Sequence, residues 1–206
     1  LQVLVTGRGG HGAIPHHTRD PIVAAAAMIT ELQQVVARKV DPLEGAVVTV
    51  GYIQGGDADN VIPGELRFGG TLRAFAPEVR ALLRTEVERV ITGVAAAHDV
   101  TVDVQVTPHV EPVVNDLKMS REVTAIAQGI AGLTVSGTDC RLLASEDFGE
   151  FLARSPGVFA FVGARNEACA ATWSHHHPRF EIDEASLEIA ARLHCEVAFG
   201  LTRLGS

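Results

Sequence analysis

Apolar residues recur with two different periods along the first half of the chain. Spacings of three and four follow Asp20-Pro21 and appear again after Pro77, and each run predicts an amphipathic helix that begins at the proline. A period of two predicts four strands, at about 2–6, 46–53, 65–75 and 100–106. The resulting order, βαββαβ, predicts a ferredoxin-like domain: a four-stranded antiparallel sheet with both helices on one face.

The second half of the chain has a less regular pattern. An all-apolar run at 158–162 predicts a buried strand. Three helices are predicted, at about 119–131, at 145–154 with Ser145 as the cap, and from Asp183 onward with Leu187 facing inward.

These elements predict an α+β chain with two domains, residues 1–112 and 113–206, joined at a proline-containing break. The second domain supplies too few strands to close a sheet of its own. We therefore interpret it as the C-terminal part of an α/β domain whose beginning is absent from this chain.

Composition argues against several classes of function. The formal net charge is -8 and the basic residues are scattered, which argues against nucleic acid as a partner. No apolar run approaches the roughly 20 residues of a membrane helix, so no membrane span is expected. Three widely spaced cysteines fit a reducing compartment, so we expect a cytoplasmic protein.

Four glycines surround His11 in a loop that follows the first strand. One interpretation is a glycine-rich turn with a solvated histidine. The other is a loop whose backbone can approach another group closely, because glycine lacks a Cβ, and can hold His11 beside it.

The run His175-His176-His177 is the clearest chemical signal, because imidazole is a common zinc ligand. A catalytic zinc needs about three protein ligands, and neighbouring histidines in an extended segment point to opposite faces. At most one or two of them can therefore reach one metal ion. A solvated run before a proline is the alternative.

Three further positions have both a structural and a functional interpretation. Glu146, next to Asp147, either stabilises a helix start or lines a site. Arg73 is either a solvated charge on a strand or a bidentate carboxylate ligand. Asn60 precedes Val61-Ile62-Pro63, where a role in the turn alone would be sufficient.

Taken together, these segments resemble the C-terminal half of the metallo-amidohydrolases that include hippurate hydrolase, N-acyl-amino-acid amidohydrolase and the plant auxin-conjugate hydrolases, a branch of the aminoacylase and carboxypeptidase G peptidase family. The resemblance covers nearly the whole chain, with the motifs in the family's order. The matching segments are Gly7 to Ala13 with Pro15-His16, Asp20-Pro21, Val47 to Gly51, Asn60 to Pro63, Gly70 to Phe75, Val114 to Asp116, Ser145 to Phe148, and His176 to Glu184.

The resemblance implies a lid, or dimerisation, domain inserted into a catalytic domain that binds two divalent metal ions, usually zinc or manganese. It implies that His176, two positions before the proline, is a metal ligand. His11 would stabilise the oxyanion, often across a dimer, and Asn60 would contact substrate, again in trans. Arg73 would bind the substrate carboxylate, and Glu146 would lie near the pocket.

This chain departs from the family pattern because the remaining metal ligands and the Glu-Glu pair with the general base lie upstream of Leu1 in the family. By itself it should bind metal weakly and hydrolyse nothing. The complete protein is expected to hydrolyse N-acyl amino acids or similar small amides, as a homodimer through the lid. The alternative is a non-catalytic dimerisation or small-molecule-binding module.

Overall fold

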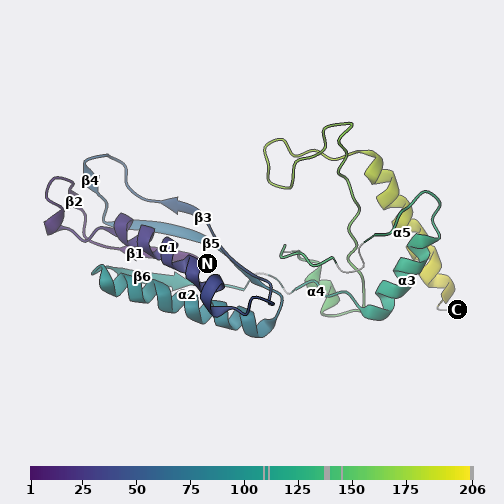
Figure 1. Cartoon of the computed structure of the whole chain (residues 1–206), viewed down its shortest axis with the longest axis horizontal. Helices are drawn as coiled ribbons and strands as arrows, with labels where there is room; N and C mark the ends of the chain where they lie inside the picture. Colours follow the sequence, from purple (N-terminus) through teal and green to yellow (C-terminus); the bar gives the residue numbers. More distant parts are fainter. Residues whose placement is uncertain (109, 111, 137–139, 145, 205–206) are drawn as a thin grey trace. The chain divides into compact units, whose positions relative to one another are not determined.

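The structure, a computed structural model, describes residues 1–108, 110, 112–136, 140–144 and 146–204 (Figure 1). It falls into two compact units, Leu1–His109 and Val110–Ser206. The first contains β1 (Gln2–Thr6), β2 (Gly10–His11), η1 (Pro15–His17), α1 (Pro21–Lys39), β3 (Ala46–Gln54), β4 (Val61–Ile62), β5 (Glu65–Ala74), α2 (Pro77–Ala97) and β6 (Thr101–Gln105). The second contains α3 (Leu117–Gln128), α4 (Gly149–Leu152) and α5 (Ala185–Leu204).

The first unit is a four-stranded sheet in the order β3-β5-β1-β6, and all neighbouring strands are antiparallel. α1 and α2 pack on each other and against the sheet (Figure 1). The mixed α and β class and the four-stranded antiparallel sheet predicted from the sequence are therefore confirmed. β3 and β6 form the two edges of this sheet.

The core of the first unit lies between the sheet and the two helices. Alternate residues of β1 and β5, such as Val5 and Phe68, point into it and meet Met28 and Leu32 of α1 and Leu83 of α2. Each such side chain contributes about 1.5–3 kcal/mol when fully buried. Both helices begin at a proline as predicted. The pattern of apolar residues was therefore sufficient to place this core.

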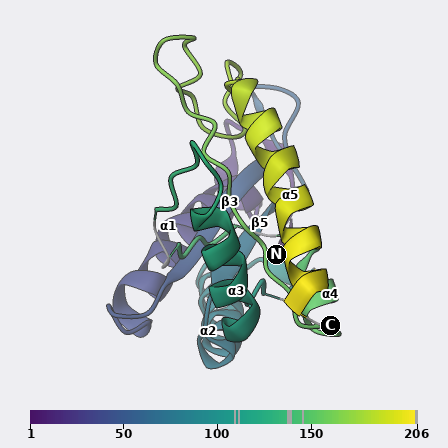
Figure 2. The same cartoon turned by 90° about the vertical axis from the view of Figure 1, so that its right-hand side faces the viewer.

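The second unit has a much smaller core. Among its described residues, the buried apolar side chains are Ala127, Ile130 and Ala171. α3 lies alongside α5 (Figure 2). Leu187, predicted to face inward from the last helix, is instead exposed. Ser145, predicted as a helix cap, lies outside the described residues, and α4 begins after it with Phe148 at its cap position.

The buried strand predicted at 158–162 is wrong. Residues 158–162 form no strand, and Phe161 is 57% exposed. The Asn115 side chain bonds both backbone groups of Phe159: it accepts from the N–H at 2.8 Å and donates to the C=O at 3.0 Å. A single amide side chain thus takes the place that a neighbouring strand would occupy, because the described part of this unit supplies no such strand.

Candidate functional site

The loop between β1 and α1, residues 7–20, carries His11 and is called the histidine loop. Two backbone hydrogen bonds join its ends, from Arg8 N–H to Arg19 C=O and from Arg19 N–H to Arg8 C=O, both 2.9 Å long. Gly7 allows this closure, because a Cβ there would lie 2.1 Å from the Arg19 oxygen. Arg19 also forms an ion pair with Asp99, with 3.2 Å between Nε and Oδ2. The loop is therefore anchored at its base.

His11 is exposed on this loop, and its ring has a defined hydrogen-bond role. The Ala13 N–H donates to His11 Nδ1 over 3.0 Å. Because Nδ1 accepts this bond, the neutral imidazole carries its proton on Nε2. Nε2–H is then the donor with which His11 can bind an acceptor outside the loop.

Asn60 lies beside the histidine loop. β2 and β4 pair as a short antiparallel ribbon, with His11 opposite Val61. The Gly12 N–H donates to the Asn60 carbonyl oxygen over 2.8 Å, and a Cβ at Gly12 would lie 3.1 Å from that oxygen. The glycine thus allows the two backbones to approach. The structure brings together His11 and Asn60, although the sequence pattern did not predict either short strand.

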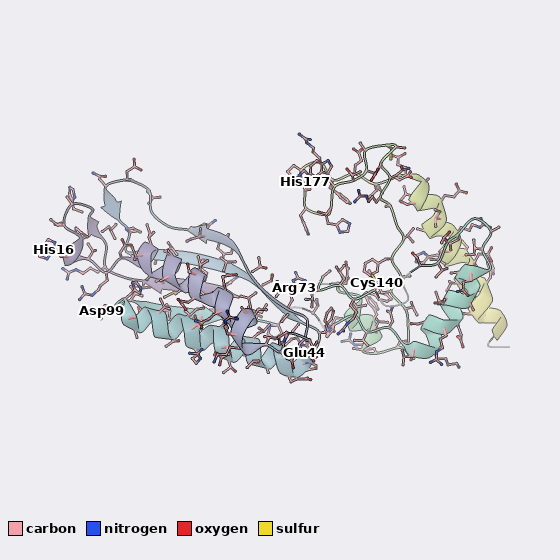
Figure 3. The ribbon with its side chains drawn as sticks, viewed as in Figure 1. His16, Glu44, Arg73, Asp99, Cys140 and His177 are labelled. Atoms are coloured by element: carbon pink, nitrogen blue, oxygen red, sulfur yellow. The ribbon has the colours of Figure 1, made fainter. Side chains whose placement is uncertain are left out.

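Arg73 lies at the opposite end of the sheet from His11. The histidine loop leaves β1 at Thr6, which is paired with Glu65 at the start of β5, whereas Arg73 is near the end of β5. At about 3.3 Å per residue the separation along the strand is roughly 25 Å. Figure 3 shows His16 of the histidine loop and Arg73 at opposite ends of the first unit. One copy of the chain therefore cannot present His11 and Arg73 to the same small substrate.

The histidine run lies in a pair of turns of the second unit. His176 has a left-handed backbone, with φ of 67°, which is uncommon for a residue with a Cβ. Its two neighbours each contact an aromatic ring: His175 meets Phe180, and His177 stacks on Trp173. Of the three histidines, His176 is the one with the left-handed backbone, and the residues on both sides of it make ring contacts.

Glu146 is exposed and precedes α4, so it lies ahead of the helix rather than within its first turn. Asp183 lies two residues before α5, and its carboxylate accepts two hydrogen bonds. The Asn166 amide donates to one oxygen at 2.7 Å and the Ala185 N–H to the other at 3.0 Å. These bonds, the first more than the second, lower the pKa of the Asp183 carboxyl.

The donor set of this chain fits part of a metal centre. In the part of the chain that the structure describes, no three histidine, cysteine or acidic side chains come close enough to hold an ion. His176 can supply one imidazole ligand, whereas a catalytic metal needs about three protein ligands. The described residues thus fit a single ligand position, and a metal site that included His176 would need further ligands.

Two residues that contribute to the site region were missed by sequence reasoning. Thr18 is 7% exposed, and its hydroxyl donates to the Pro15 oxygen at 2.7 Å inside the histidine loop. Its methyl group faces Gly10, where a Cβ would lie 2.9 Å away. Nothing periodic marks Thr18. Trp173 could have been found, because it is the single tryptophan and stands next to the histidine run.

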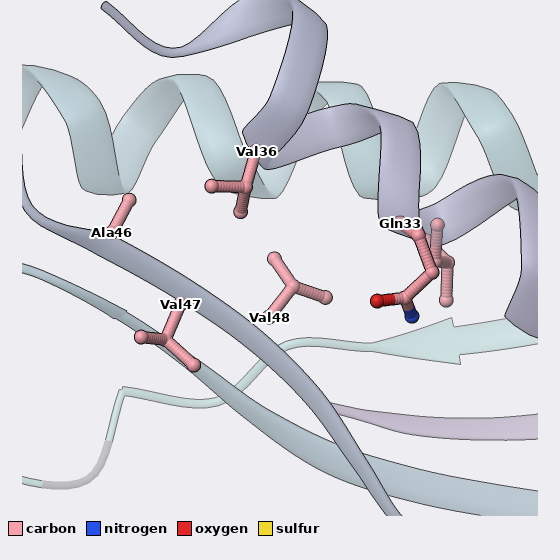
Figure 4. A pocket seen from close by; sticks show the side chains of 6 residues that line it. Gln33, Val36, Ala46, Val47 and Val48 are labelled. Atoms are coloured by element: carbon pink, nitrogen blue, oxygen red, sulfur yellow. The ribbon is translucent and has the colours of Figure 1, made fainter. Parts of the chain in front are cut away.

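A groove of about 220 Å³ lies between α1 and the edge strand β3, away from the histidine loop (Figure 4). It is lined by Leu32, Gln33, Val36, Ala46, Val47 and Val48.

No helix in the described part of the chain is long and apolar enough to cross a membrane.

Comparison with known proteins identifies the first unit as a known domain type. Residues 1–101 match the M20 peptidase dimerisation domain. The chain is 37% identical over 202 residues to the IAA-amino acid hydrolase ILR1-like 2 of Arabidopsis thaliana, covering 96% of this chain and 45% of that protein. It is 34% identical to the N-acetyldiaminopimelate deacetylase of Priestia megaterium, covering 94% of this chain and 50% of that protein.

A solved structure extends the comparison to the second unit. The YXEP protein of Bacillus subtilis, described as a dinuclear metal binding peptidase from the M20 family, matches 96% of this chain and 48% of its own. The sequence identity is 27% and the TM-score 0.66. The chain thus spans about half the length of the proteins it matches.

Proposed function

The chain belongs to the M20 family of peptidases and amidohydrolases, and from this membership we propose that the complete protein hydrolyses N-acyl amino acids or similar small amides in a metal-dependent reaction. The similarity to an IAA-amino acid hydrolase and to an N-acetyldiaminopimelate deacetylase supports this substrate class, because both of these enzymes are named for acyl groups carried on amino acids. In this proposal the chain supplies the lid and one metal ligand.

His11 is the residue that most directly supports the proposal. An amide oxygen gains negative charge when a nucleophile attacks the carbonyl carbon, and a preorganised donor stabilises that charge. The bond from Ala13 to Nδ1 leaves the proton of His11 on Nε2, so the ring is oriented as a donor before substrate arrives. We assign His11 as the oxyanion donor, with Asn60 beside it as a substrate contact.

The remaining site residues have supporting roles in this proposal. His176 would hold one of two divalent ions, zinc or manganese, which when bound would supply an activated water. Arg73 would bind the substrate carboxylate, and Glu146 would line the pocket. Because His11 and Arg73 lie at opposite ends of the sheet, they would serve one substrate from different copies of a homodimer. The chain alone would not be hydrolytic, since the described residues hold no group of three ligands.

The location proposed for the protein is the cytoplasm. Cys140, Cys169 and Cys195 are all free and exposed, which is typical of proteins kept in a reducing compartment.

Replacement of His11 in the complete enzyme tests the assignment. His11→Ala should lower kcat on an N-acyl amino acid by about 10²–10³-fold, because one oxyanion donor is lost. Metal content, measured by atomic emission, should be unchanged. His17→Ala is the matched control, since His17 is an exposed histidine of the same loop, and it should retain kcat. Wild-type turnover by His11→Ala would refute the oxyanion role.

A further inference from the structure

His177 closes two consecutive turns in the segment from Trp173 to Phe180. Its N–H donates to the Ser174 oxygen at 3.2 Å, which closes a first turn around His175 and His176. Its carbonyl oxygen accepts from the Phe180 N–H at 2.9 Å, which closes a second turn. His177 is therefore the shared corner of both turns.

The ring of His177 is held in two ways, by stacking on an aromatic ring and by a hydrogen bond to one ring nitrogen. It lies flat on the indole of Trp173, with 3.9 Å between ring centroids and 7° between planes. Its Nδ1 accepts from the Arg179 N–H at 3.1 Å. The Arg179 guanidinium carbon lies 5.6 Å from the centroid of the Trp173 ring, within the range of a cation–π contact. The imidazole thus has little freedom to reach a metal ion through Nδ1.

His176 occupies the third position of the first turn, where a left-handed backbone is needed and glycine or asparagine is usual. A histidine persists there only if the surrounding structure holds it. His177, the next residue in the chain, is held by its two turn hydrogen bonds, by the bond from Arg179 and by the stack on Trp173. His175 is held on the other side, with its ring 4.7 Å from that of Phe180.

We propose that Trp173 and His177 are positioning residues that hold His176 in its left-handed conformation and so aim its imidazole, and that His177 is not itself a ligand. This inference rests on the proposed role of His176 as a metal ligand. Partners that orient a ligand typically contribute 10- to 100-fold to metal affinity. The ring contacts and turns therefore assign different roles to the neighbouring histidines, which sequence spacing alone does not do.

The single tryptophan provides a local readout in the 206-residue chain. Ni²⁺ bound beside Trp173 should quench its fluorescence, whereas Ni²⁺ at distant histidines should not. The titration compares wild type with three variants. His176→Ala removes the ligand, His177→Phe keeps a ring on Trp173 but has no nitrogen, and His177→Ala removes both ring and acceptor. His175→Phe is the control for loss of a neighbouring imidazole.

We expect His176→Ala to abolish the quenching phase and His177→Ala to weaken Ni²⁺ binding about tenfold. His177→Phe and His175→Phe should stay within about threefold of wild type, because the turns remain packed. The proposal is overturned if His177→Phe loses as much affinity as His176→Ala, since His177 would then be a ligand. It is also overturned if His177→Ala binds like wild type.

A metal-free measurement separates this inference from the proposed function. Long-range ¹H–¹⁵N spectra of the wild-type chain should show His177 as the Nε2–H tautomer, with ring protons shifted upfield by the indole. Trp173→Ala should remove that shift. If these signals are present but His176→Ala binds Ni²⁺ like wild type, the ligand role of His176 fails and the ordered turns remain. If the signals are absent, the positioning role fails.

Discussion

Gly7 allows the base of the histidine loop to close, because it has no Cβ to collide with the facing backbone. A Cβ at this position would lie 2.1 Å from the Arg19 oxygen, which is part of the backbone and accepts the Arg8 N–H. Because the Arg19 oxygen belongs to the backbone and is hydrogen-bonded, it cannot move aside as the end of a flexible side chain would. Gly64, whose oxygen accepts the Gly7 N–H at 2.9 Å, has nothing within 4 Å of a Cβ built on it. The two glycines therefore offer a matched comparison.

Gly7→Ala should destabilise the first unit by about 1–3 kcal/mol, because an overpacked site forces the backbone to shift. Gly64→Ala should change stability by less than about 0.5 kcal/mol, since its Cβ meets open space. Urea unfolding followed by circular dichroism measures both. Equal stability of the two variants would show that the loop base relaxes at no cost.

At the scale of elements, the predictions succeeded where one periodic face meets one core. The helices after Asp20 and Pro77 and the strands of the sheet follow their apolar periods, because each buries one face. β2 and β4 were missed, since two-residue strands carry no period and arise from the close approach of Gly12 to Asn60.

The candidate site was predictable as residue types but not as geometry. The sequence pattern could nominate His11 and His176 by their chemistry. It could not show that Ala13 sets the tautomer of His11, or that Trp173 and His177 flank His176, because hydrogen bonds and ring contacts within loops have no periodic signature. The false strand at 158–162 had the same origin: an apolar run indicates burial potential but not the partner strand.

The start of α5 should depend on pH through Asp183. Its pKa is lowered by the bonds from Asn166 and Ala185, so the folded carboxylate stabilises this helix start above the ordinary aspartate pKa of about 3.9. That stabilisation is lost as the pH falls through the lower folded-state pKa. Asn166→Ala removes the larger cause and should raise the pKa toward its ordinary value, as measured by carboxyl ¹³C NMR. Asn115→Ala, which removes an amide bonded to Phe159 instead, should leave the titration in place.

For the whole molecule, the two edges of the sheet differ in a way that bears on assembly. β6 is short, and its exposed positions are polar: Thr101, Asp103 and Gln105. β3 is nine residues long, exposes Val47, Tyr52 and Ile53, and borders the 220 Å³ groove beside α1. Charged side chains protect an edge strand from pairing; β6 carries Asp103, whereas β3 carries no charged residue. β3 is therefore the edge through which we expect two copies to associate.

The same substitution on each edge tests this assignment. Thr49 of β3 and Thr101 of β6 are both exposed strand threonines. Thr49→Lys should weaken the dimer Kd about tenfold, or about 1.4 kcal/mol, because a symmetric interface brings two added charges together. Thr101→Lys should leave it unchanged, as measured by sedimentation equilibrium. Dissociation by Thr101→Lys alone would place the interface at β6. A β3 interface would also explain how His11 and Arg73, at opposite ends of one sheet, could reach one substrate from two copies.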